Sequence, residues 1–202
     1  MNICVLVSGN GTNLQALINA ETAGEFGKAG NTGKLAAVIS DRAGVYALER
    51  AKTAGIPVFV EEPDFKLPKD ARRTDLSNRI LRVCQKKEID LIVFAGFTSI
   101  IKDGIIDAYA GKMINVHPSL LPKFGGQGMY GHHVHSAVLA AGETESGCTV
   151  HIVNAETDSG PILLQRKVPV LPGDTPESLA ERIHKEEHIA LAEAVKMMLE
   201  VK

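Results

Sequence analysis

The sequence contains no tryptophan, and aromatic residues make up only 4% of its 202 residues. Hydrophobic residues nevertheless account for 45% of the chain, so its core must be built mainly from aliphatic side chains. A chain of this length suits one core better than two. We therefore expect residues 1–202 to form a single domain.

Cysteine is also scarce, and the three cysteines present, Cys4, Cys84 and Cys148, lie far apart in the chain. Their odd number argues against a disulfide framework, and their spacing fits no metal-binding pattern. We expect three buried thiols in a reducing cytoplasm.

Neither a strong charge of one sign nor a long apolar run is present. The formal net charge is -2, which argues against a basic nucleic-acid-binding protein. No apolar segment approaches the length of a membrane span, and the apolar run near the N-terminus is too short for a signal peptide and lacks a cationic start. These features predict a cytoplasmic protein whose partners are small molecules, with neither nucleic acid nor a membrane among them. They leave the oligomeric state open.

Apolar segments typical of buried strands alternate with helical patterns over the first part of the chain. The predicted strands cover residues 3–7, 35–40, 58–60, 91–95 and 113–116. The predicted helices cover residues 13–20 (with Thr12 as the N-cap), 46–54, 70–87 and 102–109. This alternation predicts an α/β, Rossmann-like fold with a mostly parallel sheet and helices on both faces. Ligands then bind at the carboxyl ends of the strands.

The pattern changes after His117. The predicted elements are then a Gly- and Pro-rich loop (119–131), a helix (133–141), and two strands (150–153 and 162–170) joined by a turn at 158–161. We expect these two strands to form a C-terminal strand pair. Thr175 followed by Pro176 is typical of a helix start, and this last, long helix should run to the C-terminus.

Residues 8–13 (SGNGTN) follow the first predicted strand and open the first helix. Glycines let the backbone approach a ligand closely, and the N–H groups at a helix start favour an anion. The segment therefore suits a phosphate, although an ordinary strand-to-helix turn would have the same composition. Asp41 could serve as the ribose-binding acid of a dinucleotide site, but Leu14 stands where the third glycine of that fingerprint belongs.

Asn115 and His117 end the fifth predicted strand and point to the same side of it. An Asn amide can donate to a developing oxyanion, and a His can exchange a proton near neutral pH. A histidine held by a local hydrogen bond beside a proline turn is the structural alternative. Asp158 is a typical turn residue, but next to His117 it would orient the imidazole and pair with its charged form.

Two further features have competing interpretations. His132, His133 and His135 form a cluster, with His151 further along, but no cysteine or paired carboxylate completes a metal site, and we predict none. Glu187 lies near the apolar stripe of the last helix. An acid there is costly to bury unless it is paired or bound to a ligand, and otherwise it belongs at the exposed edge of the stripe.

The whole chain resembles the phosphoribosylglycinamide formyltransferase family, the folate-dependent enzymes of purine synthesis. The resemblance is carried by residues 2–18 (NICVLVSGNGTNLQALI), 90–97 (DLIVFAGF), 109–123 (YAGKMINVHPSLLPK) and 147–174 (GCTVHIVNAETDSGPILLQRKVPVLPGD). The segment NVHPSLLPK followed by an Asp-X-Gly-Pro turn is a specific signature. The resemblance implies transfer of a formyl group from the co-substrate 10-formyltetrahydrofolate to the amine of glycinamide ribonucleotide.

The resemblance also implies a role for individual residues. Asn115, His117 and Asp158 match the catalytic trio: Asn115 and His117 stabilise the oxyanion, His117 passes protons to the departing folate nitrogen, and Asp158 keeps His117 charged and oriented. Neither a metal nor a covalent enzyme intermediate is implied. Gly11, Thr12 and Asn13 match the phosphate site of the ribonucleotide, and Glu187 matches an acid near its ribose. The folate-binding positions are matched by Arg73, Thr98, Ser99, Ile100, Ile101, Asn154, Ala155, Glu156 and Thr157.

His151 also has a counterpart near the site, and two features depart from the family pattern. Ser99 stands where a larger, basic residue is expected, which would loosen the contacts to folate. Residues 125–131 form a longer segment than usual, which we interpret as a glycine-rich active-site loop beside the phosphate site.

Four other functions share some of these sequence features. Formyltetrahydrofolate deformylase has the same trio but an added N-terminal domain, for which we expect no room before a strand that starts at Asn2. Methionyl-tRNA formyltransferase adds a C-terminal tRNA-binding domain, which we do not expect in this chain. A formyltransferase for another amine, such as a nucleotide sugar, and a non-enzymatic nucleotide-binding module both remain open.

Overall fold

The computed structural model describes residues 1–27 and 32–200. Within them, one seven-stranded sheet has the order β3-β2-β1-β4-β5-β6-β7. Its strands are β1 (Asn2–Val7), β2 (Lys34–Ser40), β3 (Val58–Val60), β4 (Leu91–Phe94), β5 (Met113–His117), β6 (Glu145–Ile152) and β7 (Ile162–Pro169). The strands from β3 to β5 pair in parallel, whereas β6 and β7 run antiparallel to their neighbours. The predicted mostly parallel sheet with a C-terminal strand pair is confirmed.

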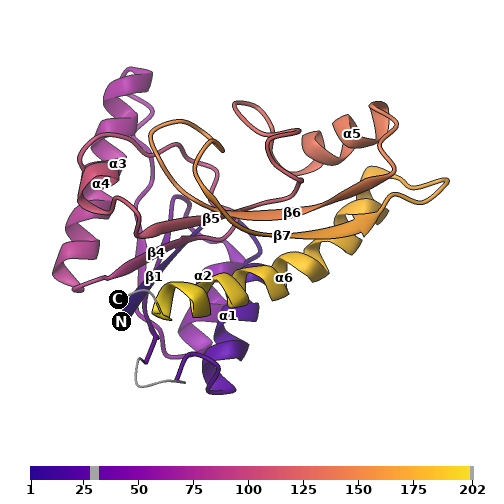
Figure 1. Ribbon diagram of the computed structural model, residues 1–202. Helices are drawn as coiled ribbons and strands as arrows, with labels where there is room; N and C mark the ends of the chain where they lie inside the picture. Colours follow the sequence, from indigo (N-terminus) through magenta and orange to yellow (C-terminus); the bar gives the residue numbers. More distant parts are fainter. Residues whose placement is uncertain (28–31, 201–202) are drawn as a thin grey trace.

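Helices cover both faces of this sheet, as predicted (Figure 1). They are α1 (Thr12–Thr22), α2 (Tyr46–Thr53), α3 (Lys69–Lys86), α4 (Gly104–Ala108), α5 (His132–Ala140) and α6 (Pro176–Glu200). Helices α1, α2 and α6 pack into one hydrophobic cluster, and α3 and α4 into another on the opposite face. Among the described residues, no helix is both long and apolar enough to span a membrane.

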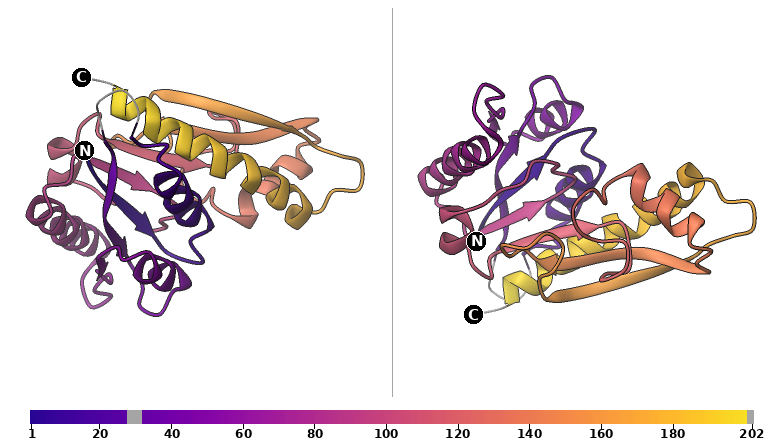
Figure 2. Two further views of the ribbon diagram at one scale, coloured as in Figure 1. Left: turned by 90° about the horizontal axis from the view of Figure 1, so that it is seen from below. Right: turned by 90° about the horizontal axis from the view of Figure 1, so that it is seen from above.

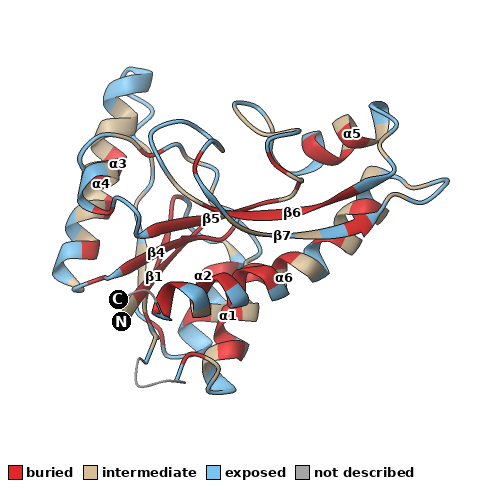
Figure 3. Cartoon of the chain, viewed as in Figure 1, coloured by how far each residue is buried: buried red, intermediate tan, exposed pale blue. Residues whose placement is uncertain are grey.

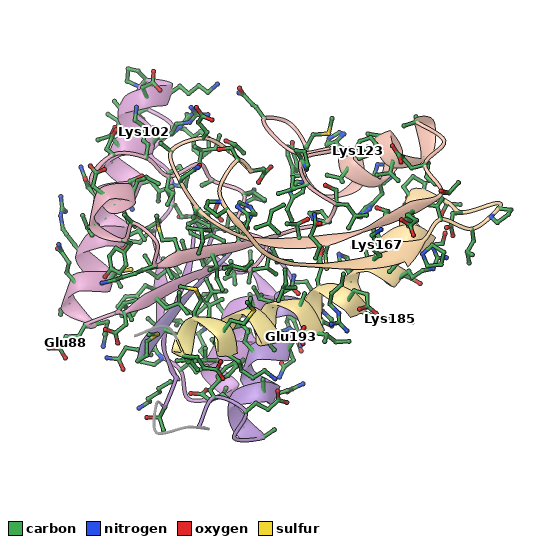
Figure 4. All side chains as sticks on the ribbon, viewed as in Figure 1. Glu88, Lys102, Lys123, Lys167, Lys185 and Glu193 are labelled. Carbon is green, nitrogen blue, oxygen red and sulfur yellow. The ribbon has the colours of Figure 1, made fainter. Side chains whose placement is uncertain are left out.

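Strand β1 is apolar along its whole length because both of its faces are covered. Val5 and Val7 belong to the cluster beneath α1 and α6, while Cys4 and Leu6 belong to the cluster beneath α3. The three cysteines are buried and unpaired, as predicted. The charged side chains labelled in Figure 4 lie around the outside of the molecule.

The antiparallel pair β6 and β7 extends beyond the parallel strands together with the first half of α6 (Figure 2). Helix α6 packs along both of these strands, and its buried positions follow one face, which is red in Figure 3. From this arm β6 runs back antiparallel to β5 and ends at Ile152, opposite Ile114.

Several predicted element boundaries were wrong. Strand β6 begins at Glu145 instead of residue 150, since the polar and small residues at its start pair with β7 in a register that sequence periodicity does not reveal. The N-cap of α1 is Gly11, not Thr12. Gly11 has a left-handed backbone conformation, and Thr12 is the first residue of the helix itself. The predicted start of α6 is confirmed: the Ser178 N–H donates to Thr175 Oγ1 at 3.3 Å.

Replacing Gly11 tests this local geometry. Gly11 has a φ of 76°, and a Cβ added there would lie 2.6 Å from the Cβ of Ala47. Gly24 has a similar φ of 74° but no atom within 4 Å of such a Cβ. We expect Gly11→Ala to lower the free energy of unfolding by about 1–3 kcal/mol more than Gly24→Ala does, because only Gly11 adds a steric clash. Urea denaturation of both variants measures the difference, and equal losses would contradict the close approach of α1 and α2.

Candidate active site

A cavity of about 710 Å³ lies at the carboxyl ends of β1, β4 and β5, where a doubly wound sheet binds its ligands. It gathers nearly all of the predicted site residues from segments far apart in the sequence. Its lining includes Asn115, His117, Asp158, Gly11, Thr12, Asn13, Glu187, Thr98, Ser99, Ile100, Ile101, Asn154, Ala155, Glu156 and Thr157. Arg73 is the exception among the described residues: it lies on α3, 4.0 Å from Asp70, and does not line the cavity. Its predicted contact with folate stays a prediction.

The antiparallel pairing of β5 with β6 sets the first part of the site. Asn115 pairs with His151 across the two strands. His151 Nδ1 lies 3.0 Å from the carbonyl oxygen of Ile152, which can only accept, so Nδ1 carries a proton. In the neutral ring, Nε2 therefore accepts a hydrogen bond from Asn115 Nδ2, at 3.2 Å. This contact fixes which end of the Asn115 amide is the donor.

His117 lies buried between a backbone carbonyl and a carboxylate. Its Nε2 donates to the carbonyl oxygen of Phe124 at 2.8 Å, and its Nδ1 lies 3.5 Å from Asp158 Oδ2. The proximity of Asp158 to His117, which the spacing of the two residues along the chain does not reveal, is thus present in the structure. The alternative of a local hydrogen bond is present as well, since the Phe124 carbonyl takes one of the two ring nitrogens.

Asp158 has a φ of 56° and faces several groups that stabilise its charged form. Burial alone would raise the pKa of its carboxyl group, but the contacts with His151 and His117 and the N–H of Gly126 outweigh burial and hold the pKa below its ordinary value. The Gly126 N–H donates to Oδ2 at 2.9 Å, and Oδ1 lies 3.6 Å from His151 Nε2. The two imidazoles stabilise the charged form of Asp158 when each carries a proton on the nitrogen that faces it, Nε2 of His151 and Nδ1 of His117.

Glu187 is 4% exposed, so the interpretation as an exposed edge of the apolar stripe was wrong. Burial raises the pKa of its carboxyl group, and the amide of Asn13 and the nearby His184 and His117 partly oppose that rise. Asn13 Nδ2 donates to Glu187 Oε2 at 3.0 Å. Asn13 Oδ1 is buried without a protein partner. This oxygen lies on a residue that lines the cavity, where a ligand donor would satisfy it.

The segment of residues 98–101 is held in place by the residues that follow β1 and β2. The Thr98 N–H donates to Ser8 Oγ at 2.8 Å, and Ser99 Oγ donates to Asp41 Oδ2 at 2.6 Å. Arg42 Nη2 donates to Thr98 Oγ1 at 2.8 Å. Ser99 is therefore tied to a buried carboxylate although it is smaller than the basic residue expected there. Asp41, considered above as a ribose-binding acid, is occupied by this contact and does not line the cavity.

The histidines after the glycine-rich loop do not converge on one point. His132 pairs with Glu177 at 3.1 Å, and the ring of His133 packs edge-on against Tyr130. His135 is buried, which together with nearby histidines lowers its pKa to about 4. Within residues 1–27 and 32–200, no group of three or more His, Cys, Asp or Glu side chains is arranged to hold a metal ion.

Two groups of residues in or beside this cavity were not predicted from the sequence. The first is the backbone of Phe124 and Gly126, which contacts His117 and Asp158. The loop was expected at the site, but backbone contacts leave no signal in side-chain types. The second is His184, which lines the cavity and lies 4.0 Å from Glu187. His184 could have been predicted from its position three residues before Glu187, because residues three apart lie on the same face of a helix.

Residues 1–195 match the protein family described as formyl transferase. The chain is 38% identical to phosphoribosylglycinamide formyltransferase of Escherichia coli (strain K12), over 93% of this chain and 82% of that protein. It is 40% identical to the trifunctional purine biosynthetic protein adenosine-3 of Drosophila melanogaster, over 98% of this chain. The chain spans only 14% of the length of that trifunctional relative.

Solved structures agree with these relatives. Glycinamide ribonucleotide transformylase 1 from Symbiobacterium toebii superposes with a TM-score of 0.88 at 38% identity, covering 99% of this chain and 88% of that one. A formyltetrahydrofolate deformylase from Pseudomonas syringae superposes with a TM-score of 0.84, covering 98% of this chain and 61% of that one, but at 23% identity it shares the fold alone.

The lowered pKa of Asp158 predicts a pH-dependent contribution to stability. A carboxyl group whose pKa is depressed by folding stabilises the folded state above its unfolded pKa, near 3.8, and loses that contribution as the pH falls through the folded value. We expect Asp158→Asn to be less stable than the unsubstituted chain at pH 6, and the difference to shrink below pH 4 (about the unfolded pKa of an Asp). Urea denaturation at several pH values measures it. A difference that stays constant or grows at low pH would show that the ionised form of Asp158 is not the one that folding favours.

Proposed function

The chain belongs to the formyl transferase family, and on that premise we propose that it transfers the formyl group of 10-formyltetrahydrofolate to the amine of glycinamide ribonucleotide in de novo purine biosynthesis. One observation carries the proposal: a single cavity gathers Asn115, His117 and Asp158 together with the start of α1 and residues 98–101 and 154–157. The catalytic trio would then lie between a ribonucleotide and a folate.

The ribonucleotide would bind where α1 begins. Gly11, Thr12 and Asn13 present backbone N–H groups at a helix N-terminus, which suits a phosphate. Of the described residues that line the cavity, none is Lys or Arg, so backbone donors and histidines would have to neutralise the phosphate. Asn13 Oδ1 and the Glu187 carboxylate offer acceptors for the ribose hydroxyl groups.

The folate would bind on the other side of the trio. Phe97, Ile100, Ile101 and Val153 provide apolar surface for a flat ring system, and residues 154–157 provide polar atoms around it. The hydrogen bonds that Ser8 and Asp41 accept and that Arg42 donates would keep this surface preformed. Arg73, outside the cavity lining, would act only on a part of the folate that extends toward α3.

In the reaction, the amine nitrogen bonds to the formyl carbon and the bond from that carbon to the folate nitrogen breaks. One proton leaves the amine and one reaches the folate nitrogen, so the protons balance. Asn115 would donate from its amide to the developing oxyanion, in the orientation that His151 imposes. His117 would stabilise the same oxyanion and carry the proton, and the anionic Asp158 would hold its charged form in place. We propose that residues 1–202 work as one such domain, with small molecules as partners. The three free, buried thiols suit the reducing cytoplasm.

The proposal is tested by incubating the protein with 10-formyltetrahydrofolate and following the absorbance of the folate product, with and without glycinamide ribonucleotide. Product that forms only with the ribonucleotide supports the transferase. Folate release at the same rate without the ribonucleotide would establish a hydrolase instead. No reaction with the ribonucleotide would reject this amine as the acceptor.

His117→Ala should abolish most of the turnover while the chain still folds, because the imidazole has both the electrostatic and the proton-transfer role. A loss of about 10²-fold or more in kcat is expected. His132→Ala is the matched control, since His132 is an exposed histidine on α5 outside the cavity lining. Thermal melts of both variants separate misfolding from lost chemistry. Full activity of His117→Ala would remove this residue from the mechanism.

A further inference from the structure

The turn of residues 124–126 contacts both ionisable members of the trio through its backbone. The carbonyl oxygen of Phe124 lies 2.8 Å from His117 Nε2, and the Gly126 N–H donates to Asp158 Oδ2 at 2.9 Å. An acceptor thus faces the imidazole and a donor faces the carboxylate. Both residues have positive φ angles, 55° for Phe124 and 93° for Gly126, and these conformations aim the two groups into the site.

The position of this turn is fixed by buried side chains. Ser119 Oγ donates to the carbonyl oxygen of Lys123 at 2.7 Å, directly before Phe124. Thr149 on β6 donates to the carbonyl oxygen of Ser119 at 2.6 Å and accepts from the Leu121 N–H at 3.0 Å. Ser119 and Thr149 are both fully buried. The Phe124 carbonyl is therefore anchored to the same strand that carries His151.

A carbonyl oxygen can only accept a hydrogen bond, so the ring nitrogen facing it must carry a proton. In the other neutral tautomer, lone pairs of His117 Nε2 and of the Phe124 oxygen would face each other at 2.8 Å. No comparably short contact fixes the protonation of Nδ1. It lies 3.5 Å from Asp158 Oδ2, which is the distance of an ion pair and exceeds that of a good hydrogen bond. A proton on Nδ1 can therefore be shared with a ligand in the cavity.

We propose that the turn of residues 124–126 fixes His117 as the Nε2–H tautomer, so that Nδ1 is the nitrogen that takes and returns the proton in formyl transfer. The second half of this statement rests on the proposed function, whereas the tautomer does not. Nδ1 takes the proton that the amine loses as its bond to the formyl carbon forms. It gives a proton to the folate nitrogen as the bond from that nitrogen to the formyl carbon breaks.

Nitrogen-15 NMR of the full chain, labelled at its histidines, tests the tautomer without any substrate. The signals of His117 are identified by their absence from His117→Asn. Spectra are recorded at a pH high enough for the His117 ring to carry a single proton. The other titratable groups that interact with His117 or Asp158 are His151, His135 and Glu187. A protonated Nε2 and a bare Nδ1 are expected. A protonated Nδ1 with a bare Nε2 would overturn the proposal, whatever the enzymatic assay shows.

Gly126→Ala tests the role of the turn. At Gly126 a Cβ would meet no atom within 4 Å, so its effect comes from the φ of 93°, which alanine disfavours. We expect the Nδ1–H tautomer of His117 to gain population and kcat to fall about 10–100-fold, with a much smaller change in KM for the ribonucleotide. Gly173→Ala is the matched control, because Gly173 has a φ of 82°, equal space, and no place in the cavity lining.

The outcomes of this comparison are separable. The proposal is supported if Gly126→Ala shows an altered tautomer and a lowered kcat while Gly173→Ala shows neither. A tautomer and kcat equal to those of Gly173→Ala would show that the turn does not position His117. If the unsubstituted chain transfers no formyl group but shows the Nε2–H form, the proposed function fails while the tautomer assignment holds.

Discussion

The antiparallel pairing of β6 with β5 is the constraint on which the rest of the site depends. It sets Asn115 opposite His151 and His117 opposite Thr149, and these pairs orient the Asn115 amide and anchor the turn of residues 124–126. Strand β6 ends at Ile152, opposite Ile114. The segment that follows β6 then folds back, so that Asp158 lies beside His117.

Two buried carboxylates in this cavity have opposite pKa shifts, and the difference follows from their neighbours. Asp158 faces two imidazoles and a backbone N–H, which outweigh the effect of burial and lower its pKa. Glu187 lies on an apolar helix face with one amide and a more distant histidine, so burial prevails and raises its pKa. One acid is thus suited to hold a charged imidazole, and the other to share hydrogen bonds with a neutral ligand group.

Much of this fold could be predicted from the sequence, because the buried strands are unbroken apolar runs and Gly or Pro marks most of their ends. The start of β6 could not, since its polar and small residues become a strand only by pairing with β7. The trio could be proposed from Asn115 and His117 on one strand, joined to Asp158 by a family resemblance. The Phe124 and Gly126 contacts could not, because any residue type supplies a carbonyl or an N–H. Whether Glu187 is buried or exposed could not be predicted, because its partner Asn13 lies on another helix, far away in the sequence.

We propose that one cavity holds a ribonucleotide and a folate on either side of Asn115, His117 and Asp158. A crystal structure of the chain with glycinamide ribonucleotide and a folate analogue that cannot transfer its formyl group tests it most directly. We expect the phosphate at Gly11, Thr12 and Asn13, the pteridine ring against residues 98–101, and the amine within reach of His117. A phosphate bound elsewhere, or a folate on the far side of α6, would contradict it.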